Sequence, residues 1–92
     1  ELIEGLVYGE TWTRTQLSER DRSLVTIAVT QAAYQSDQLR VHLGRGLDNG
    51  LTAEELAESM AQVTLYAGFP SGVNGARILA EVLRERDIPL PD

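Results

Sequence analysis

His42 is the only histidine in the chain and the only side chain whose ordinary pKa lies near 7. It could therefore take up or release a proton at neutral pH, as a general acid or a general base. A lone histidine beside an apolar helix face is also a common structural residue. The residue type alone leaves both a catalytic and a structural role for His42 open.

Further polar residues that could take part in chemistry lie before it. The segment 10–16 carries the only tryptophan, Trp12, between the carboxylate of Glu10 and the guanidinium of Arg14. Burial beneath Trp12 would raise the pKa of Glu10 and make it a candidate acid or base. A tryptophan in a loop most often covers the edge of the core, but Trp12 could also form the wall of a pocket. Arg22 could reach inward from its helix, or stay in solvent beside an aspartate.

Missing residue types exclude several kinds of chemistry. The 92 residues contain no cysteine, which excludes disulfides, thiol redox catalysis and thiolate metal sites. One histidine cannot form a histidine-rich metal site within a subunit, and the absence of lysine excludes Schiff-base chemistry. No nucleophile elbow, glycine-rich phosphate loop or metal-binding motif occurs. An enzyme with this sequence would therefore use acid–base and electrostatic catalysis without a cofactor.

The charge of the chain limits its partners. A net charge of −6 suits neither nucleic acid nor an anionic membrane, because both attract basic surfaces. The eight basic residues are all arginines, whose planar side chains suit carboxylate recognition, although GC-rich codon usage would explain the same composition. No apolar run reaches the roughly 18 residues of a membrane span, and no signal peptide is visible. We expect a cytoplasmic protein.

Hydrophobic periodicity predicts an all-α fold in a single domain over residues 1–92, with no strand. Four or five helices are expected around a central helical hairpin. The predicted helices cover residues 1–9, 19–34, 36–49, 53–66 and 71–86, with Gly9 ending the first and a loop over 10–16. The chain opens without a methionine in what reads as the middle of a helix. We therefore expect that an upstream segment is missing.

The stretch 17–50 is expected to form the central hairpin. Ser18 is a good N-cap for its first helix, and Asp21 three residues later suggests a weak capping box. That helix is apolar on most of its circumference, which is typical of a buried helix. The apolar positions are Leu24, Val25, Ile27, Ala28, Ala32 and Ala33. Ser36 or Asp37 would cap the second helix, and Gly50 would end it.

The second helix of the hairpin carries His42. Its buried stripe is defined by leucines at i, i+4 and i+8, and His42 lies at the edge of that stripe. These leucines are Leu39, Leu43 and Leu47. Gly44 and Gly46 are unfavourable inside a helix and indicate close packing of another helix or of a ligand.

The two C-terminal helices are predicted to support the hairpin. Thr52 and Glu55 form a capping box before the third helix. The segment 67–70 breaks the chain, and the small residues at 71–76 would let a neighbour approach the last helix closely. The predicted buried positions are Leu56, Met60, Val63, Ala67, Ala76, Leu79, Ala80 and Leu83.

Four stretches closely resemble the carboxymuconolactone decarboxylase family. They are YGETWTR (8–14), LSERDRSLVTIA (17–28), LRVHLGRGLDNGLTAEELAE (39–58) and YAGFPSGVNGA (66–76). The match covers nearly the whole chain, in order and at the expected spacing. In the family's alkylhydroperoxidase AhpD-like branch, a histidine follows four residues after a CxxC motif.

That register places Gln35 and Gln38 at the thiol positions and His42 at the family histidine. The chain therefore lacks the peroxidase machinery of that branch. Its GE-x-W (9–12) and RDRSL (20–24) pieces look like the decarboxylase branch. The resemblance implies an AhpD-like all-α fold that assembles as a homo-oligomer, a trimer or a hexamer, with sites near the subunit contacts.

The resemblance also implies a reaction, the decarboxylation of 4-carboxymuconolactone in aromatic-acid breakdown through protocatechuate. Loss of carbon dioxide would push electrons through the alkene into the lactone carbonyl, so the substrate is its own electron sink. His42 would protonate the dienolate or donate to the carbonyl oxygen, with Glu10 setting its protonation. The remaining implied residues bind the substrate: Arg14 and Arg22 hold carboxylates, and Trp12 and Tyr66 form walls that exclude water.

Two other functions remain open on the sequence. The chain could act on another small acid or on a polyketide-like substrate. It could also be a non-catalytic helical oligomer or binding protein of the same fold. A pocket where His42, Glu10 and an arginine meet would favour the enzyme. A histidine buried against leucines with no cavity beside it would favour the non-catalytic protein.

Overall fold

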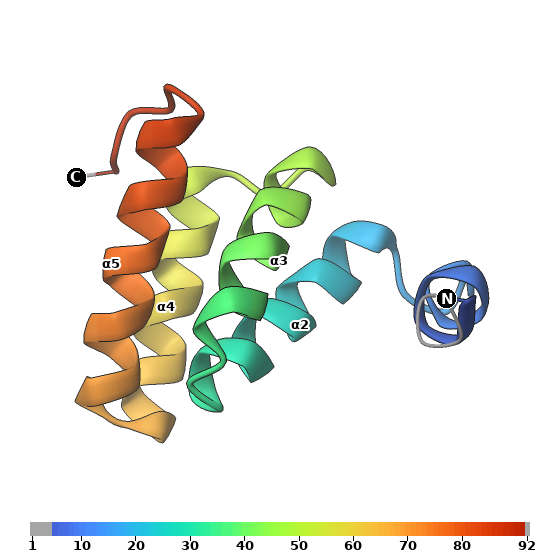
Figure 1. Ribbon diagram of the computed structural model, residues 1–92, viewed down its shortest axis with the longest axis horizontal. Coiled ribbons are helices and arrows are strands. Elements are labelled where there is room, and N and C mark those ends of the chain that lie inside the picture. The colour runs from blue at the N-terminus through green and yellow to red at the C-terminus, as the bar shows by residue number, and fades with distance from the viewer. Residues whose placement is uncertain (1–4, 92) are drawn as a thin grey trace.

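Five helical segments make up the computed structural model, which describes residues 5–91 (Figure 1). They are the π-helix η1 (Gly5–Thr11) and the α-helices α2 (Glu19–Ala32), α3 (Ser36–Asp48), α4 (Ala53–Ala67) and α5 (Phe69–Glu85). No strand occurs in this part of the chain, so the prediction of an all-α fold is confirmed.

The helices form two antiparallel pairs, α2 with α3 and α4 with α5. The hairpin α2–α3 packs against the hairpin α4–α5, because α2 contacts both α4 and α5 and α3 contacts α5. Figure 1 shows η1 at the side of the bundle away from α5, joined to α2 by a loop. The stretch predicted to be central therefore lies between the N-terminal segment and the C-terminal hairpin.

The N-terminal helix differs from the prediction. Its described part is a π-helix that passes Gly9 and ends at Thr11, so Gly9 is not its end. Glu10 was predicted to lie in a loop but belongs to η1. Of the predicted apolar stripe, Leu2 and Ile3 lie outside the described residues, and so do the side chains at positions 6 and 7.

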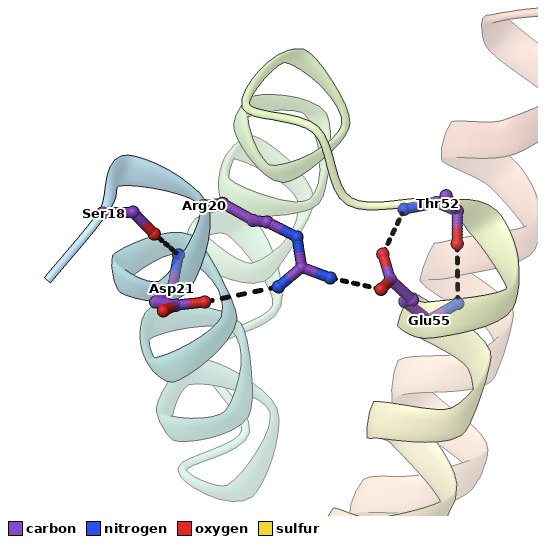
Figure 2. A network of polar contacts seen from close by, with 5 residues as sticks. All are labelled: Ser18, Arg20, Asp21, Thr52 and Glu55. Carbon is purple, nitrogen blue, oxygen red and sulfur yellow. Dashed lines mark hydrogen bonds and ion pairs between the residues drawn. The ribbon is translucent and has the colours of Figure 1, made fainter.

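The starts of α2 and α4 follow the predicted capping chemistry, and one arginine links them (Figure 2). Ser18 Oγ accepts a hydrogen bond of 3.0 Å from the backbone N–H of Asp21. Thr52 and Glu55 form the predicted capping box, with each side chain accepting from the other's backbone N–H. Arg20 pairs with Asp21 at 3.3 Å and with Glu55, and so ties the first turns of the two helices together.

The connection between α2 and α3 uses an unexpected residue. The N–H groups of Tyr34 and Gln35 bond back to carbonyls of the last turn of α2 at 3.1 and 2.9 Å, which is a Schellman motif. Tyr34 takes the left-handed position, with φ 62°, where glycine is usual. Its hydroxyl donates to the carbonyl of Pro70 at 3.1 Å and holds the turn against α5. Gln35 then takes the N-cap position of α3 without a side-chain capping hydrogen bond, whereas the sequence predicted Ser36 or Asp37 as the cap.

The same motif ends α3 and α5. Gly50 has φ 106° after α3, so the predicted glycine stop is confirmed. Asp87 takes that position after α5 with φ 57°, and the N–H of Ile88 bonds the carbonyl of Leu83 at 2.9 Å. Two of the three residues that take this position in the motif, Tyr34 and Asp87, carry a Cβ, and each costs about 1 kcal/mol.

The break between α4 and α5 is shorter than predicted. Gly68, with φ 103°, is the only residue between the two helices. The helix α5 begins at Phe69, two residues before the predicted start, and Pro70 fits its first turn because no hydrogen-bonded N–H is needed there.

The core lies between the two hairpins and is built from aliphatic side chains. Buried core residues are Ile27, Leu39, Leu43, Leu51, Leu56, Met60, Ile78, Leu79, Val82 and Leu83. Most predicted positions on α3 and α4 are among them. On α5 the buried face is centred nearer to Ile78 and Val82 than predicted, and Ala76 is exposed. Ala67, predicted to be buried, is also exposed at the end of α4.

The helix α2 is not buried all round in the single chain, contrary to the prediction. Its inner face carries Ile27 and the fully buried Gln31, but Val25 and Val29 are 54% and 59% exposed. The reason is that the other three α-helices cover one side of α2 only. Its second apolar stripe faces outward.

Glycines in α3 and α5 serve helix packing, as predicted. A Cβ on Gly46 would lie 2.9 Å from methyl carbons of both Ile27 and Leu51. On α5, a Cβ on Gly72 would collide with the side chain of Thr64 in α4. The neighbours that these two glycines admit therefore belong to the same chain.

Candidate functional site

His42 lies on the inner edge of α3 and is 5% exposed. The leucines at positions 39 and 43 that flank it are fully buried. Burial lowers the pKa of His42 below its ordinary value of 6.5, and the nearby charge of Arg45 lowers the pKa further. The imidazole is therefore neutral at pH 7.

Trp12 covers the imidazole. The two rings are stacked, with centroids 6.2 Å apart and an angle of 13° between their planes. Trp12 follows directly after η1, in a turn that a threonine holds in place. Thr13 Oγ1 donates to the carbonyls of Gly9 and Glu10 at 3.1 and 2.9 Å. The end of η1 thus sets the position of the indole over His42.

A surface hollow of about 350 Å³ adjoins this stack. It lies where the Trp12 turn meets the first turn of α2 and the last turn of α3. The residues that line it are Trp12, Thr13, Glu19, Arg45, Asp48 and Asn49. It offers one guanidinium, two carboxylates, a hydroxyl and an amide against one aromatic wall, which suits a small polar ligand.

Neighbouring residues hold the α3 side of the hollow. Arg86 donates to Asp48 Oδ1 at 2.8 Å, and this hydrogen bond lowers the pKa of Asp48. Arg86 lies against Gly44, where a Cβ would be 2.8 Å from its Nη2. Asn49 Nδ2 donates to Ser23 Oγ at 3.0 Å. Much of the negative charge of Asp48 is therefore compensated from the α5 side.

Comparison with known proteins places this chain in a family. The model of the carboxymuconolactone decarboxylase family matches residues 1–81. The chain belongs to this family. Gln35 takes the N-cap position of α3, and Gln38 lies in the first turn of this helix, four residues before His42.

Two relatives in this family are named as decarboxylases. The chain is 40% identical over 86 residues to 4-carboxymuconolactone decarboxylase of Acinetobacter baylyi, covering 94% of this chain and 64% of the relative. It is 26% identical over 85 residues to nitrosuccinic acid decarboxylase of Metarhizium robertsii, covering 92% and 59%.

A third relative carries no activity in its name. It is an uncharacterized 15.0 kDa protein from the nqo9–nqo10 intergenic region of Paracoccus denitrificans, 34% identical over 82 residues, with 87% of this chain and 61% of the relative covered. The chain thus spans about three fifths of the length of these relatives.

The structure brings together only some of the residues predicted for the site. His42 and Trp12 are in contact. Glu10 is exposed on η1 and does not line the hollow. Arg14 is exposed in the loop, and its backbone carbonyl accepts a hydrogen bond of 3.5 Å from Arg22 Nη2.

Of the predicted site residues, only Trp12 is among the described residues that line the hollow. His42, Arg22 and Tyr66 are not lining residues. Arg22 is partly buried on α2, and its Nε is buried without a hydrogen-bond partner among the described residues. Tyr66 is 86% exposed near the end of α4, while the hollow lies at the end of α3. Figure 1 shows these two helix ends at opposite ends of the bundle.

The hollow also contains a residue that the sequence reasoning missed. Arg45 follows His42 by three residues, which places both on neighbouring faces of one helix. That spacing is visible in the sequence and could have indicated the pairing. Among the described residues, no group of three histidine or acidic side chains could hold a metal ion. None of the described helices is long and apolar enough to cross a membrane.

Proposed function

We propose that the chain is the single catalytic domain of a cofactor-independent decarboxylase similar to 4-carboxymuconolactone decarboxylase. It acts by acid–base catalysis on a small carboxylated lactone in protocatechuate breakdown. The observation that carries the proposal is a neutral His42 stacked under Trp12, beside a hollow that contains an arginine. The identity of 40% to a decarboxylase of that name supports the same class of reaction.

The names of the two decarboxylase relatives support a common type of substrate. Each names an acid that also carries an electron-withdrawing group, a lactone in one and a nitro group in the other. When the carbon–carboxylate bond breaks, carbon dioxide leaves and the electron pair moves onto an oxygen of that group. The protein then has to orient the acid, stabilise the enolate or nitronate and supply a proton to carbon.

His42 is proposed to supply that proton. An anionic substrate beside the imidazole opposes the burial and the Arg45 charge that keep His42 neutral in the free protein. Binding therefore raises the pKa of His42, and the imidazole takes up a proton from solvent. It then passes this proton to the α-carbon of the dienolate and returns to the neutral form, with Glu10 influencing its protonation.

Trp12 is proposed to form the wall that keeps water away from the reacting carbon. Because His42 is 5% exposed, the turn that carries Trp12 moves aside to admit the substrate. On the outer side of this turn, Arg14 and Arg22 are proposed to attract carboxylates. Their link through the Arg14 carbonyl supports a shared position.

We further propose that the chain works as a homo-oligomer, a trimer or a hexamer. Four large apolar side chains at the α4–α5 corner are 68–86% exposed, which is unusual for a monomer. They are Leu65, Tyr66, Phe69 and Val73. In such an assembly Tyr66 would form a pocket wall against a neighbouring subunit. Light scattering on the purified chain tests this, because a monomeric mass would contradict it.

A non-catalytic oligomer of the same fold is the second candidate. The burial of His42 between Trp12 and the core is the observation that favours it, since a structural histidine would be placed in the same way. The two functions differ in one measurable property, which is turnover that depends on His42.

The experiment is an ultraviolet assay of the consumption of freshly generated 4-carboxymuconolactone by the wild type, His42→Ala and His42→Gln. Circular dichroism and light scattering confirm that each variant is folded. Turnover in the wild type that falls at least about a hundredfold in both variants supports His42 as the proton donor. Turnover that survives supports the reaction but assigns the proton to another residue, with Glu10→Gln tested next. No turnover by a folded wild type supports the non-catalytic protein.

A further inference from the structure

We infer that Arg45 binds a carboxylate of the substrate, the one that stays on the product. This inference rests on the proposed function and names a specificity-determining residue for it. Arg45 is the only arginine among the described residues that line the hollow beside the Trp12–His42 stack. A guanidinium is the side chain that best matches a carboxylate, since it donates two parallel hydrogen bonds.

The position of Arg45 fits this role. It lies one turn beyond His42 on α3, and the same hollow reaches Trp12, which covers His42. A small acid held by Arg45 would therefore lie along the edge of the indole. Its other end would lie near Trp12, whose indole is stacked with the imidazole. The spacing of one helical turn matches the length of a substrate with a few carbon atoms.

The two carboxylates of the hollow do not prevent an anion from binding there. Asp48 is bound by Arg86 from outside the hollow, at 2.8 Å. Glu19 is the first residue of α2, where the N–H groups of the helix start offset a negative charge. Thr13 and Asn49 add a hydroxyl and an amide. Arg45 is thus the cation against which a bound acid would be placed.

The direction of charge movement decides which carboxylate Arg45 holds. During decarboxylation, negative charge leaves the departing carboxylate and moves to the electron-accepting oxygen. A cation on the departing carboxylate would stabilise the ground state more than the transition state, and would slow the reaction. A cation on the carboxylate that stays stabilises both states equally. Arg45 on the retained carboxylate therefore improves binding without opposing the chemistry.

Binding can be measured without turnover, because Trp12 is the only tryptophan and lines the hollow. Fluorescence is titrated with succinate and with the uncharged succinamide. We expect a saturable change with succinate alone, and about a tenfold to hundredfold weaker binding in Arg45→Gln. Arg84→Gln is the matched control, because Arg84 is exposed on α5 and is not a lining residue. Glu19→Gln should tighten binding by about twofold to fivefold.

Kinetics on the lactone test the choice of carboxylate. Arg45→Gln should raise KM by about tenfold to a hundredfold and leave kcat nearly unchanged. A higher kcat in the variant would place Arg45 on the departing carboxylate. A fall in kcat with unchanged KM would place it on the accepting oxygen. Either result would overturn the inference.

The binding titration and the kinetic experiment together show whether this inference or the proposed function is wrong. Arg45-dependent binding of succinate without any turnover supports the carboxylate site but contradicts the decarboxylase. Turnover with no succinate binding, or with binding equal in Arg45→Gln and Arg84→Gln, supports the decarboxylase and overturns the role of Arg45. Arg45→Lys keeps the charge and should recover part of the binding, whereas a merely structural loss would not be rescued in this way.

Discussion

The imidazole of His42 is stacked under the indole of Trp12, with 6.2 Å between the ring centroids and 13° between the ring planes. The indole comes from the turn after η1 and the imidazole from α3. The only tryptophan and the only histidine of the chain, about 30 residues apart in sequence, are thus stacked on each other. The protonation of His42 therefore depends on the position of a surface turn.

Replacing Trp12 should change the protonation of His42 directly. In Trp12→Ala, water reaches the imidazole, so desolvation weakens and the pKa of His42 rises toward 6.5. Trp12→Phe keeps an apolar ring over His42, so the pKa of His42 should stay nearly as low as in the wild type. The His42 ring protons titrated by NMR give both values. An unchanged pKa in Trp12→Ala would mean that the indole does not desolvate the imidazole.

The depressed pKa of His42 predicts how stability depends on pH. The unfolded chain binds a proton at His42 below about pH 6.5, and the folded chain binds it only at lower pH. Stability from this residue is therefore full above pH 6.5 and is lost as the pH falls below it. The depressed carboxyl groups, Asp48, Glu55 and Glu81, titrate well below this range. Urea unfolding between pH 7.5 and 5.5 measures the loss, and His42→Gln should abolish most of it.

Adding a methyl group to each of two glycines of α3 should have different effects. In Gly46→Ala the new Cβ meets methyl carbons of Ile27 and Leu51 at 2.9 Å, and we expect a loss of about 1–3 kcal/mol. In Gly44→Ala it meets only the end of the Arg86 side chain, which can move, while alanine favours the helix by about 1 kcal/mol. Chemical denaturation compares the two variants. Equal losses would contradict this difference.

The left-handed residue after α5 offers a stabilising substitution. Asp87 has φ 57°, and glycine adopts this conformation without strain. Asp87→Gly should therefore raise the free energy of unfolding by about 0.5–1 kcal/mol. Tyr34→Gly removes the same strain but also the hydrogen bond to Pro70, so its net effect should be a loss. Melting temperatures of the two variants should move in opposite directions.

The sequence predicted those parts of the fold that local chemistry determines. The caps at Ser18 and Thr52, the stop at Gly50 and the leucine stripe of α3 all depend on residues within a turn or two of each other. The outward stripe of Val25 and Val29 could not be predicted, because one helix cannot reveal which side its neighbours cover. Tyr34 was missed because its left-handed turn is held by a contact with Pro70, 36 residues away.

The site also has features that the local sequence predicts and features that depend on distant contacts. His42 was a candidate from its residue type and its edge position on α3. Two further features depend on how the π-helix ends before the turn: Trp12 covers His42, and Glu10 is exposed. No local sequence pattern indicates where this helix ends. The spacing of Arg45 from His42 could be read from the sequence. A role for Arg45 is indicated only by the structure, because Arg45 lines the hollow.

The single-residue link at Gly68 has a consequence for the order in which the chain folds. Residues of α4 and α5 that meet near this link are close in sequence, so their contacts close short loops at little entropic cost. The pairing of α2 with α4 closes much longer loops. The C-terminal hairpin is therefore expected to form early, and its backbone amides should be among the slowest to exchange with deuterium. The Trp12 turn should exchange faster than this hairpin, so the wall of the candidate site belongs to a less persistent part of the molecule.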